Sequence, residues 1–404
     1  MRKRYFFIPL MVIIIIAGVS VWACKHPFGP GLFNLPIDED NNISDNNDYN
    51  INPTLFNSSR KIPALTVTKN KVILATAGNP SGPITVKRSS NMGASWDETT
   101  VNGTISGVGY IHPFFINCHN GDILLGVTSN NSGSKTTIIY RGKDDGQNWS
   151  VATNISFSEI CKDTKECFVT YGQGITLRHG ANANAQKLMF PYFYTNSTNG
   201  KFTATMISED DGGTFKNNFS AGGKYAYGTF NTYETKFIEL CDGNVLLNMR
   251  ASFGNNDSYW MKSADCGKTW TVVTANSHAE RPDAAHADFT RYEFSGKDIK
   301  NNGSKYALAI YSSHTASSYT VKMTTNDFNN GAGNGGLDAK YGYTRELVSE
   351  SGREDGYPAI TVLPDGTIAT LTEEDDNVVF RRFNLSWLTY QDEKINYDID
   401  LKNN

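Results

Sequence analysis

Short apolar runs separated by polar clusters fill the sequence from about residue 55 onward. The runs are rich in Val, Ile, Tyr, Phe and Thr, and the clusters between them consist mainly of Asn, Gly and Asp. Runs of this length and composition predict β-strands. The clearest are residues 71–78, 136–142, 187–194, 202–208, 244–250, 305–313, 319–325 and 367–373. No stretch carries the pattern of an amphipathic helix of ordinary length, so we expect an all-β protein.

A polar turn followed by an aromatic residue recurs along these predicted strands. It reads SSNMGASW at 89–96, GKDDGQNW at 142–149, SEDDGGTF at 208–215 and SADCGKTW at 263–270. The third positions are Asn91, Asp144, Asp210 and Asp265, spaced 53, 66 and 55 residues apart, and a weaker echo places Asn326 another 61 residues on. Asp or Asn can bind its own turn, Gly takes the strained position, and the aromatic residue packs between strands. This period predicts a propeller of four-stranded blades, and residues 55–392 have room for six.

The N-terminus has the pattern of a secretory signal. A basic MRKR precedes an apolar stretch that runs up to Cys24, and residues 21–24 resemble a bacterial lipobox. This reading makes Cys24 a lipidated residue that anchors the protein to a membrane. An uncleaved membrane anchor and an ordinary signal peptide are the alternatives, and all three place the rest of the chain outside the cytoplasm. We expect a flexible tether at 25–54 and a polar tail at 393–404.

Charge and cysteine usage exclude several classes of partner. The chain has 37 basic and 41 acidic residues, so it has no basic field to attract nucleic acid. Without Cys24, five cysteines remain, and this odd number leaves at least one thiol unpaired. Cys161 and Cys167 are close enough in sequence to form a disulfide, or they are both thiols. The cysteine spacing matches no zinc pattern, so we expect no metal. We also expect no cofactor and a monomer.

The repeated turn resembles the Asp box, or BNR repeat, of the bacterial sialidases (neuraminidases). Further segments resemble that family in the same order: residues 60–77, 172–180, 233–250, 356–374 and 378–389. The resemblance covers about residues 55–392. It implies a six-bladed propeller and an exo-α-sialidase that hydrolyses terminal sialic acid from glycoconjugates with retention. Sialylated glycans or glycoproteins are then the expected partners.

Sialic acid presents an unusual problem, because its anomeric carbon carries a carboxylate that repels a carboxylate nucleophile. Sialidases are an exception among glycosidases and use tyrosine. A phenol has a pKa of about 10 and needs a base beside it. The resemblance assigns the nucleophile to Tyr357 and the base to Glu234. Glu239 is the competing base, but only Glu234 has the family's spacing to Arg250.

The substrate carboxylate needs fixed cations, and guanidinium suits this because it binds carboxylate with two hydrogen bonds and stays charged. Sialidases use three arginines, and Arg250 matches the second. For the first, the family has Arg directly before Ile-Pro, whereas this chain has Lys61 there and Arg60 one residue earlier. Strand side chains alternate, so Lys61 faces the site in regular register and Arg60 does so only after a bulge. Glu373 matches the carboxylate that orients the first arginine.

Two family positions have no counterpart in this sequence. The third arginine should precede the strand at 319–325, but SSHTASSYTV contains none, and His314 is the nearest cation. The family's general acid lies between the first strand and the first Asp box, but no Asp or Glu occurs from Ile62 through Trp96. An alternative function is therefore a catalytically impaired propeller that binds sialylated glycans without cleaving them. A third reading is another class of secreted propeller that shares only the Asp boxes.

Overall fold

The computed structural model describes most of the predicted propeller. The described residues are 54–57, 59–131, 134–155, 164–179, 182, 187–196, 201–218, 232–240, 242–251, 258–272, 286–294, 298–301, 304–305, 309–315, 318–324, 343–349, 356–388 and 397–400. The predicted signal with Cys24, the tether as far as residue 53, Cys161 and the echo at Asn326 lie outside them. No helix among the described residues is long and apolar enough to cross a membrane.

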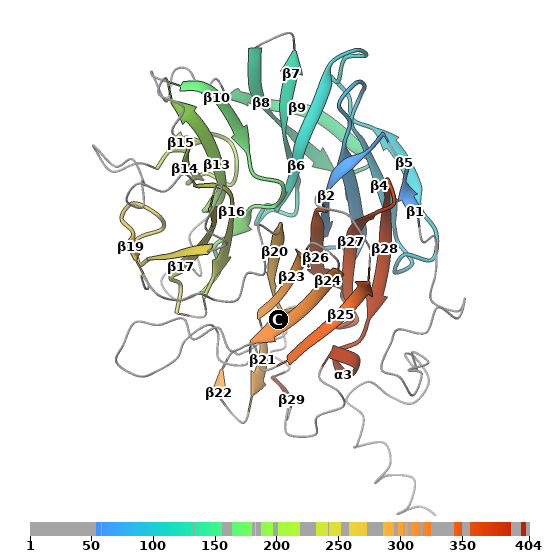
Figure 1. The fold of residues 1–404 in the computed structure, drawn as a ribbon, viewed down its shortest axis with the longest axis vertical. Coiled ribbons are helices and arrows are strands. Elements are labelled where there is room, and N and C mark those ends of the chain that lie inside the picture. The colour runs from blue at the N-terminus through green and yellow to red at the C-terminus, as the bar shows by residue number, and fades with distance from the viewer. Residues whose placement is uncertain are drawn as a thin grey trace, which may run out of the picture. The chain divides into compact units, whose positions relative to one another are not determined.

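The described elements are strands apart from one short helix, α3 (Leu385–Leu388). Six sheets of four or five strands follow one another along the chain, from blue to red in Figure 1. The first has β2 (Lys61–Val67), β3 (Ile73–Gly78), β4 (Thr85–Ser89) and β5 (Asp97–Thr100); the second has β6 (Gly109–Asn117), β7 (Ile123–Asn131), β8 (Ser134–Lys143), β9 (Asn148–Ile155) and β11 (Gly172–Gln173); the third has β10 (Thr164–Val169), β12 (Ile175–Thr176), β13 (Leu188–Asn196), β14 (Lys201–Ser208) and β15 (Lys216–Asn217).

The second half of the chain continues the series. The fourth sheet has β16 (Thr232–Glu239), β17 (Val245–Ala251), β18 (Ser258–Ser263) and β19 (Thr271–Val272); the fifth has β20 (Ala287–Arg291), β23 (Ala309–Thr315), β24 (Ser318–Thr324) and β25 (Tyr343–Ser349); the sixth has β26 (Pro358–Val362), β27 (Ile368–Glu374), β28 (Asn377–Phe383) and β1 (Thr54–Phe56). A three-stranded sheet joins β21 (Asp298–Asn301) to β22 (Ser304–Lys305) and to β29 (Tyr397–Asp400), which lies in the segment predicted to be a tail. The expected all-β propeller arrangement is confirmed.

The chain closes the ring of sheets with its two distant ends. β1 pairs with β28, so Phe56 lies opposite Val378 in the sixth sheet. The other strands pair antiparallel with their neighbours, except that β11 pairs with β6 in parallel. The inner strands, which lie at one edge of each sheet or next to that edge in the second, are β2, β6, β10, β16, β20 and β26. The starts of these inner strands are the places where residues from different sheets meet.

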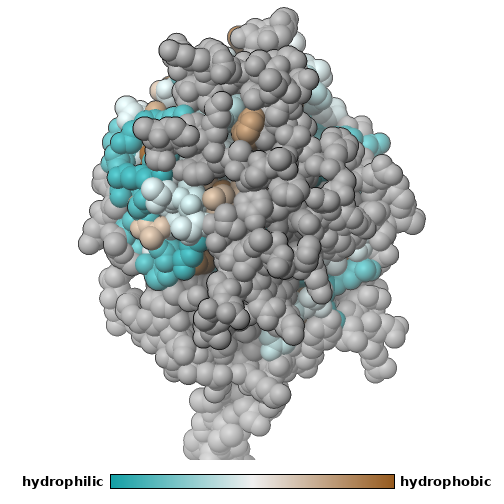
Figure 2. Space-filling model, turned by 60° about the vertical axis from the view of Figure 1, so that its left-hand side comes forward, coloured by the Kyte–Doolittle hydropathy of each residue, from teal (hydrophilic) through white to brown (hydrophobic). Residues whose placement is uncertain are grey.

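The core lies between neighbouring sheets. Phe114 of the second sheet packs on Phe190 of the third, with 4.7 Å between ring centroids. Strands buried on both faces explain why the apolar runs in the sequence are nearly continuous rather than alternating. Among the described residues only Ile105 and Val151 are large hydrophobic side chains left exposed. Figure 2 accordingly shows mainly hydrophilic described residues on one face, with scattered hydrophobic ones.

The four repeated polar turns, called boxes below, join the third and fourth strands of the first four sheets. They are residues 89–96, 142–149, 208–215 and 263–270. In each box the third residue binds its own turn. Asp210 Oδ1 accepts from the backbone N of Thr214 over 2.8 Å, and Asp265 Oδ1 accepts in the same way from Thr269 over 2.8 Å. Asn91 Oδ1 accepts from the backbone N of Ser95 over 2.9 Å. These aspartates are structural, because their oxygens are occupied within the turn.

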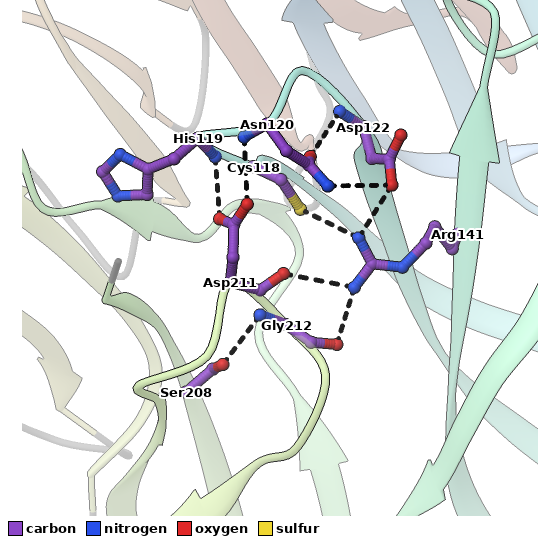
Figure 3. A network of polar contacts seen from close by, with 8 residues as sticks. All are labelled: Cys118, His119, Asn120, Asp122, Arg141, Ser208, Asp211 and Gly212. Carbon is purple, nitrogen blue, oxygen red and sulfur yellow. Dashed lines mark hydrogen bonds and ion pairs between the residues drawn. The ribbon is translucent and has the colours of Figure 1, made fainter. Parts of the chain in front are cut away.

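The fourth residue of each box joins its sheet to the preceding one. Its backbone is left-handed, with φ of 59° at Met92, 54° at Asp145, 55° at Asp211 and 58° at Cys266. Figure 3 shows the third box: the Asp211 carboxylate accepts from the backbone N of His119 over 2.7 Å and of Asn120 over 2.9 Å. Arg141 Nη2 donates to the Asp211 carbonyl over 3.1 Å. The box therefore fixes the β6–β7 turn of the neighbouring sheet, a role that the sequence pattern alone does not reveal.

Candidate active site

Three inner strands are bulged close to the end where they begin. The pairing shifts lie at residues 61–63 of β2, 111–114 of β6 and 233–236 of β16. In each bulge one residue other than glycine has a left-handed backbone: Ile62, His112 and Glu234, with φ of 60°, 53° and 44°. Bulges re-aim side chains, and strained backbone of this kind gathers at functional sites. The three bulges mark one end of the ring as the candidate site.

The bulge in β16 brings Glu234 to Tyr357, which directly precedes β26. The Tyr357 hydroxyl donates to Oε1 of Glu234 over 2.7 Å. Glu234 is only 7% exposed. The ring of Tyr171 meets that of Tyr357 edge to face, with 4.8 Å between centroids. The structure thus joins two residues that the sequence predicts to act together, although 123 positions separate them.

The second oxygen of Glu234 lies among nitrogen groups. Arg250 Nη1 donates to Oε2 of Glu234. His286 Nδ1 lies 2.9 Å from the same oxygen, and the His286 ring lies against Tyr357 with 3.6 Å between centroids. Tyr233 pairs with Arg250 across the ladder, which places the arginine at the same end of the fourth sheet as Glu234. Glu234 is therefore held on both oxygens.

These contacts shift the pKa values of Glu234 and Tyr357 in opposite directions. Burial alone would raise the pKa of Glu234, but the charge and hydrogen bond of His286 and the charge of Arg250 outweigh it and hold the pKa well below its ordinary value. Burial and then the charge of Glu234 raise the pKa of Tyr357 well above its ordinary value. At neutral pH the pair is therefore a carboxylate beside a neutral phenol.

The bulge in β2 decides how the two neighbouring cations face. Lys61 pairs with Gly78 and Pro63 with Ala77, so β2 contains one extra residue at this point. The extra residue reverses the alternation of side chains before it. Arg60 therefore takes the face of the strand that regular pairing would give to Lys61. Arg60 is half-buried, and its Nη1 has no hydrogen-bond partner among the described residues. Burial lowers its pKa, against the charge of Glu98.

Lys61 points elsewhere, because its Nζ lies 3.8 Å from Asp376 in a largely exposed ion pair. Glu373 Oε1 accepts from the backbone N of Ile62, so this carboxylate supports the bulge itself. Glu373 therefore lies beside the backbone of the bulge, whereas the charge that acts on the Arg60 guanidinium is that of Glu98.

A buried ion pair forms a layer beneath the candidate site. Lys236 follows Glu234 by two residues, and its Nζ lies 3.2 Å from Asp288 Oδ1 with both side chains 2% exposed. The same Nζ lies 3.5 Å from the centroid of the Tyr171 ring. Asp288 Oδ2 accepts from the backbone N of Ile360 over 3.1 Å. The pair ties the fourth, fifth and sixth sheets together directly below Tyr357.

Sequence reasoning missed His286, His112 and the Lys236–Asp288 pair. Burial lowers the pKa of His112 to about 4, against the charge of Glu234, so its ring is neutral at neutral pH. One signal was available: Pro113 follows His112 within the apolar run at 109–117, and proline inside a strand indicates a bulge. No comparable signal marks His286, which lies just outside β20.

The competing base, the cation nearest to the third arginine position and the loop expected to carry the general acid remain to be placed. Glu239, the competing base, lies at the opposite end of β16 and accepts from the backbone N of Arg178. His314 lies in β23 opposite Tyr319. The loop expected to carry an acid is short and closed: Asn79 Nδ2 donates to the Pro83 carbonyl over 2.9 Å.

The described residues contain no group of three or more His, Cys, Asp or Glu side chains that could hold a metal ion. The groups at the bulged end of the ring are a phenol, a carboxylate, two imidazoles and guanidinium groups. The carboxylate can take the phenolic proton, and the guanidinium groups can bind an anion.

A known protein resembles this chain in sequence. The chain is 26% identical over 362 residues to a sialidase of Micromonospora viridifaciens, a match that covers 81% of this chain and 52% of that protein. The chain thus spans about half the length of this curated relative. No protein-family model matches the sequence.

Solved structures resemble the chain in fold. The Hadza microbial sialidase Hz136 superimposes with a TM-score of 0.65 at 20% identity, covering 82% of this chain and 66% of that one. An intramolecular trans-sialidase from Ruminococcus gnavus gives 0.66 at 14% identity, covering 85% and 99%. A Trypanosoma rangeli sialidase gives 0.58 at 20% identity, covering 83% and 56%. The resemblance to sialidases is confirmed, and the chain has their propeller fold.

Proposed function

We propose that this protein is a sialidase-type glycoside hydrolase that removes terminal sialic acid from glycans with retention. The observation that carries the proposal is the 2.7 Å hydrogen bond from the Tyr357 hydroxyl to Glu234, at the end of the ring where Arg250 and Arg60 also lie. A neutral phenol beside a buried carboxylate is a nucleophile with its base, and it avoids the repulsion that a carboxylate nucleophile would meet at the anomeric carbon.

In the first step Glu234 takes the phenolic proton while the Tyr357 oxygen bonds to the anomeric carbon. The bond to the leaving oxygen breaks with its electron pair, and that oxygen takes a proton from water. In the second step water attacks the same carbon and loses a proton to solvent, and the Tyr357 oxygen departs and recovers the proton from Glu234. Two displacements at one carbon give net retention.

Substrate binding raises the pKa of Glu234, the base. Arg250 holds Glu234 in the free protein, and a substrate carboxylate competes for the same guanidinium. As Arg250 turns to the substrate, Glu234 loses a neighbouring cation and its pKa rises from its depressed value, which makes it a stronger base. His286 is a positioning residue that holds Glu234 toward Tyr357 throughout.

Two further features complete the proposal. We propose that each of the six larger sheets is one blade of a six-bladed ring, with β1 closing the last blade. We also propose that Cys24 carries a lipid and that the ring acts outside the cytoplasm, on the basis of the apolar N-terminal segment alone.

A pair of substrates tests the function on the full chain. We expect turnover of an aryl sialoside with an activated leaving group. We expect roughly 10²–10⁴-fold slower turnover of sialyllactose, because no Asp or Glu occurs from Ile62 through Trp96 to protonate a sugar leaving group. Comparable rates on both would show that an acid elsewhere in the chain fills that role. Turnover of neither, with measurable binding of free sialic acid, would replace the hydrolase by the binding protein.

Product analysis in the same assay separates hydrolysis from transfer. Free sialic acid whose first-formed anomer matches the substrate supports a retaining hydrolase. A 2,7-anhydro product would indicate an intramolecular trans-sialidase, the activity named for the structural neighbour from Ruminococcus gnavus.

The bulge in β2 predicts which cation binds the substrate. We expect Arg60→Ala to raise KM for the aryl sialoside by about tenfold or more, because a hydrogen bond to a charged group is lost. Lys61→Ala is the matched control and should leave KM nearly unchanged, because Lys61 pairs with Asp376 at the exposed surface. A larger KM effect from Lys61→Ala would mean that β2 faces the site in regular register.

A further inference from the structure

A cavity lies at the end of the inner strands opposite the candidate active site. Each of three inner strands carries candidate-site residues where it begins and cavity residues where it ends. β16 runs from Glu234 to Glu239, β20 starts after His286 and ends at Arg291, and β26 starts after Tyr357 and ends at Val362. Glu234 and Glu239 are five residues apart on one strand, which is roughly 16 Å. The cavity has a volume of about 910 Å³ and does not include the candidate catalytic residues.

The wall of this cavity suits a sugar. Hydroxyl and amide groups line it from five sheets, at Thr66, Asn117, Thr176, Thr290 and Thr361. Apolar residues line it between them, including Phe115, Phe237 and Phe289, whose side chains are nearly fully buried. A wall with many hydrogen-bonding groups matches the hydroxyls of a pyranose. The volume lies at the upper end of the range for small-molecule sites.

The rim of the cavity has an excess of positive charge. Lys69, Lys71 and Arg178 are exposed at the cavity and have no ion-pair partner among the described residues. The two carboxylates of the cavity are already occupied. Glu239 accepts from the backbone N of Arg178 over 2.7 Å, and Glu293 lies 2.9 Å from His179 Nε2. The unpaired charge therefore favours an anion.

Two polar atoms are buried in the wall without a hydrogen-bond partner in the described part of the chain. They are Oδ1 of Asn117 and Nε2 of His119, both on cavity-lining residues. A buried polar atom without a partner is costly, so such atoms in a cavity wall indicate a ligand group that completes them. The turn that carries His119 is rigid, because Asp211 of the third polar box accepts from its backbone, as Figure 3 shows.

We infer that this cavity binds an anionic sugar, with its carboxylate at Lys69, Lys71 and Arg178 and its hydroxyls on the threonine and amide wall. The buried Lys236–Asp288 pair lies between this cavity and Tyr357, so the sugar does not reach Tyr357. The second site holds an acidic glycan while the opposite end of the ring performs its own chemistry. It needs no turnover at Tyr357.

Calorimetric titration of the full chain tests the site with D-glucuronate as the probe, D-glucose as its neutral counterpart and inorganic phosphate as a simple anion. We expect glucuronate to bind at least about tenfold more tightly than glucose or phosphate. Lys71→Ala/Arg178→Ala should weaken glucuronate binding by about tenfold or more, and Arg250→Ala at the other end should leave it unchanged. The replaced side chains at the cavity are exposed, so the variant should keep the unfolding temperature of the parent.

Three results would overturn the inference. The first is no detectable binding of glucuronate at millimolar concentration. The second is binding that Arg250→Ala abolishes, which would place the sugar at the candidate active site. The third is phosphate binding as tight as that of glucuronate, which would make the rim a plain anion site. None of these results bears on hydrolysis at Tyr357, so the two proposals fail separately.

Discussion

Replacing Tyr357 by phenylalanine is expected to lower turnover of an aryl sialoside by roughly 10³-fold or more, because loss of a nucleophile removes the covalent route altogether. The substitution deletes one oxygen and leaves the ring, which still packs against His286 and Tyr171. The fold and the affinity for free sialic acid should therefore persist. Initial rates and a binding titration on the same preparation check both expectations.

Tyr171→Phe is the matched control for this experiment. Tyr171 is a fully buried tyrosine that touches the half-buried Tyr357 ring, but its hydroxyl donates to the Ala287 carbonyl over 2.9 Å rather than to Glu234. Its loss should change the rate only a few-fold. If Tyr357→Phe retained the parent's rate, or if Tyr171→Phe reduced it as strongly, the nucleophile would lie elsewhere.

Lys236→Met is expected to lower the free energy of unfolding by about 3–5 kcal/mol, because it leaves the buried Asp288 carboxylate without its cation. Asp288→Asn should cause a loss of similar size by leaving a buried ammonium. Burial already lowers the pKa of Lys236 and raises that of Asp288, each against the pull of the other charge. Urea unfolding of each variant measures the loss.

The double variant Lys236→Met/Asp288→Asn identifies the cause. Removing both charges leaves no unpaired ion, so its loss should be clearly smaller than the sum of the two single losses. Lys61→Met serves as a surface control, because its pairing with Asp376 is exposed and should contribute little. Strict additivity of the two buried substitutions would show that packing, rather than charge pairing, explains their effects.

The sequence predicts the architecture because its signals are local. A turn residue such as Asp265 binds within four positions of itself, so its role can be read from a short window. The apolar runs likewise reflect burial of each strand between two neighbours. The resemblance then brings Tyr357 and Glu234 together as a pair, and the structure places them in contact.

The missed features depend on pairing between distant strands. The choice between Arg60 and Lys61 depends on a bulge in the ladder with β3, which a one-dimensional pattern does not contain. His286 and Asp288 come close to Glu234 and Lys236 only because the fourth and fifth sheets are neighbours. An ionisable residue in an apolar run, as Lys236 is in its strand, indicates a buried partner but does not identify it.

The pairing of β1 with β28 means that the ring of sheets cannot close until the end of the chain has been synthesised. About 320 residues separate the two strands, and a ribosome adds roughly 5–20 residues per second, so β1 emerges on the order of 20–60 s before its partner. Until then the ring of sheets is open, and Tyr357 precedes β28 by only 20 residues, so it too is made late. If the proposed function holds, the nascent chain is inert toward sialosides until its last strands close the ring.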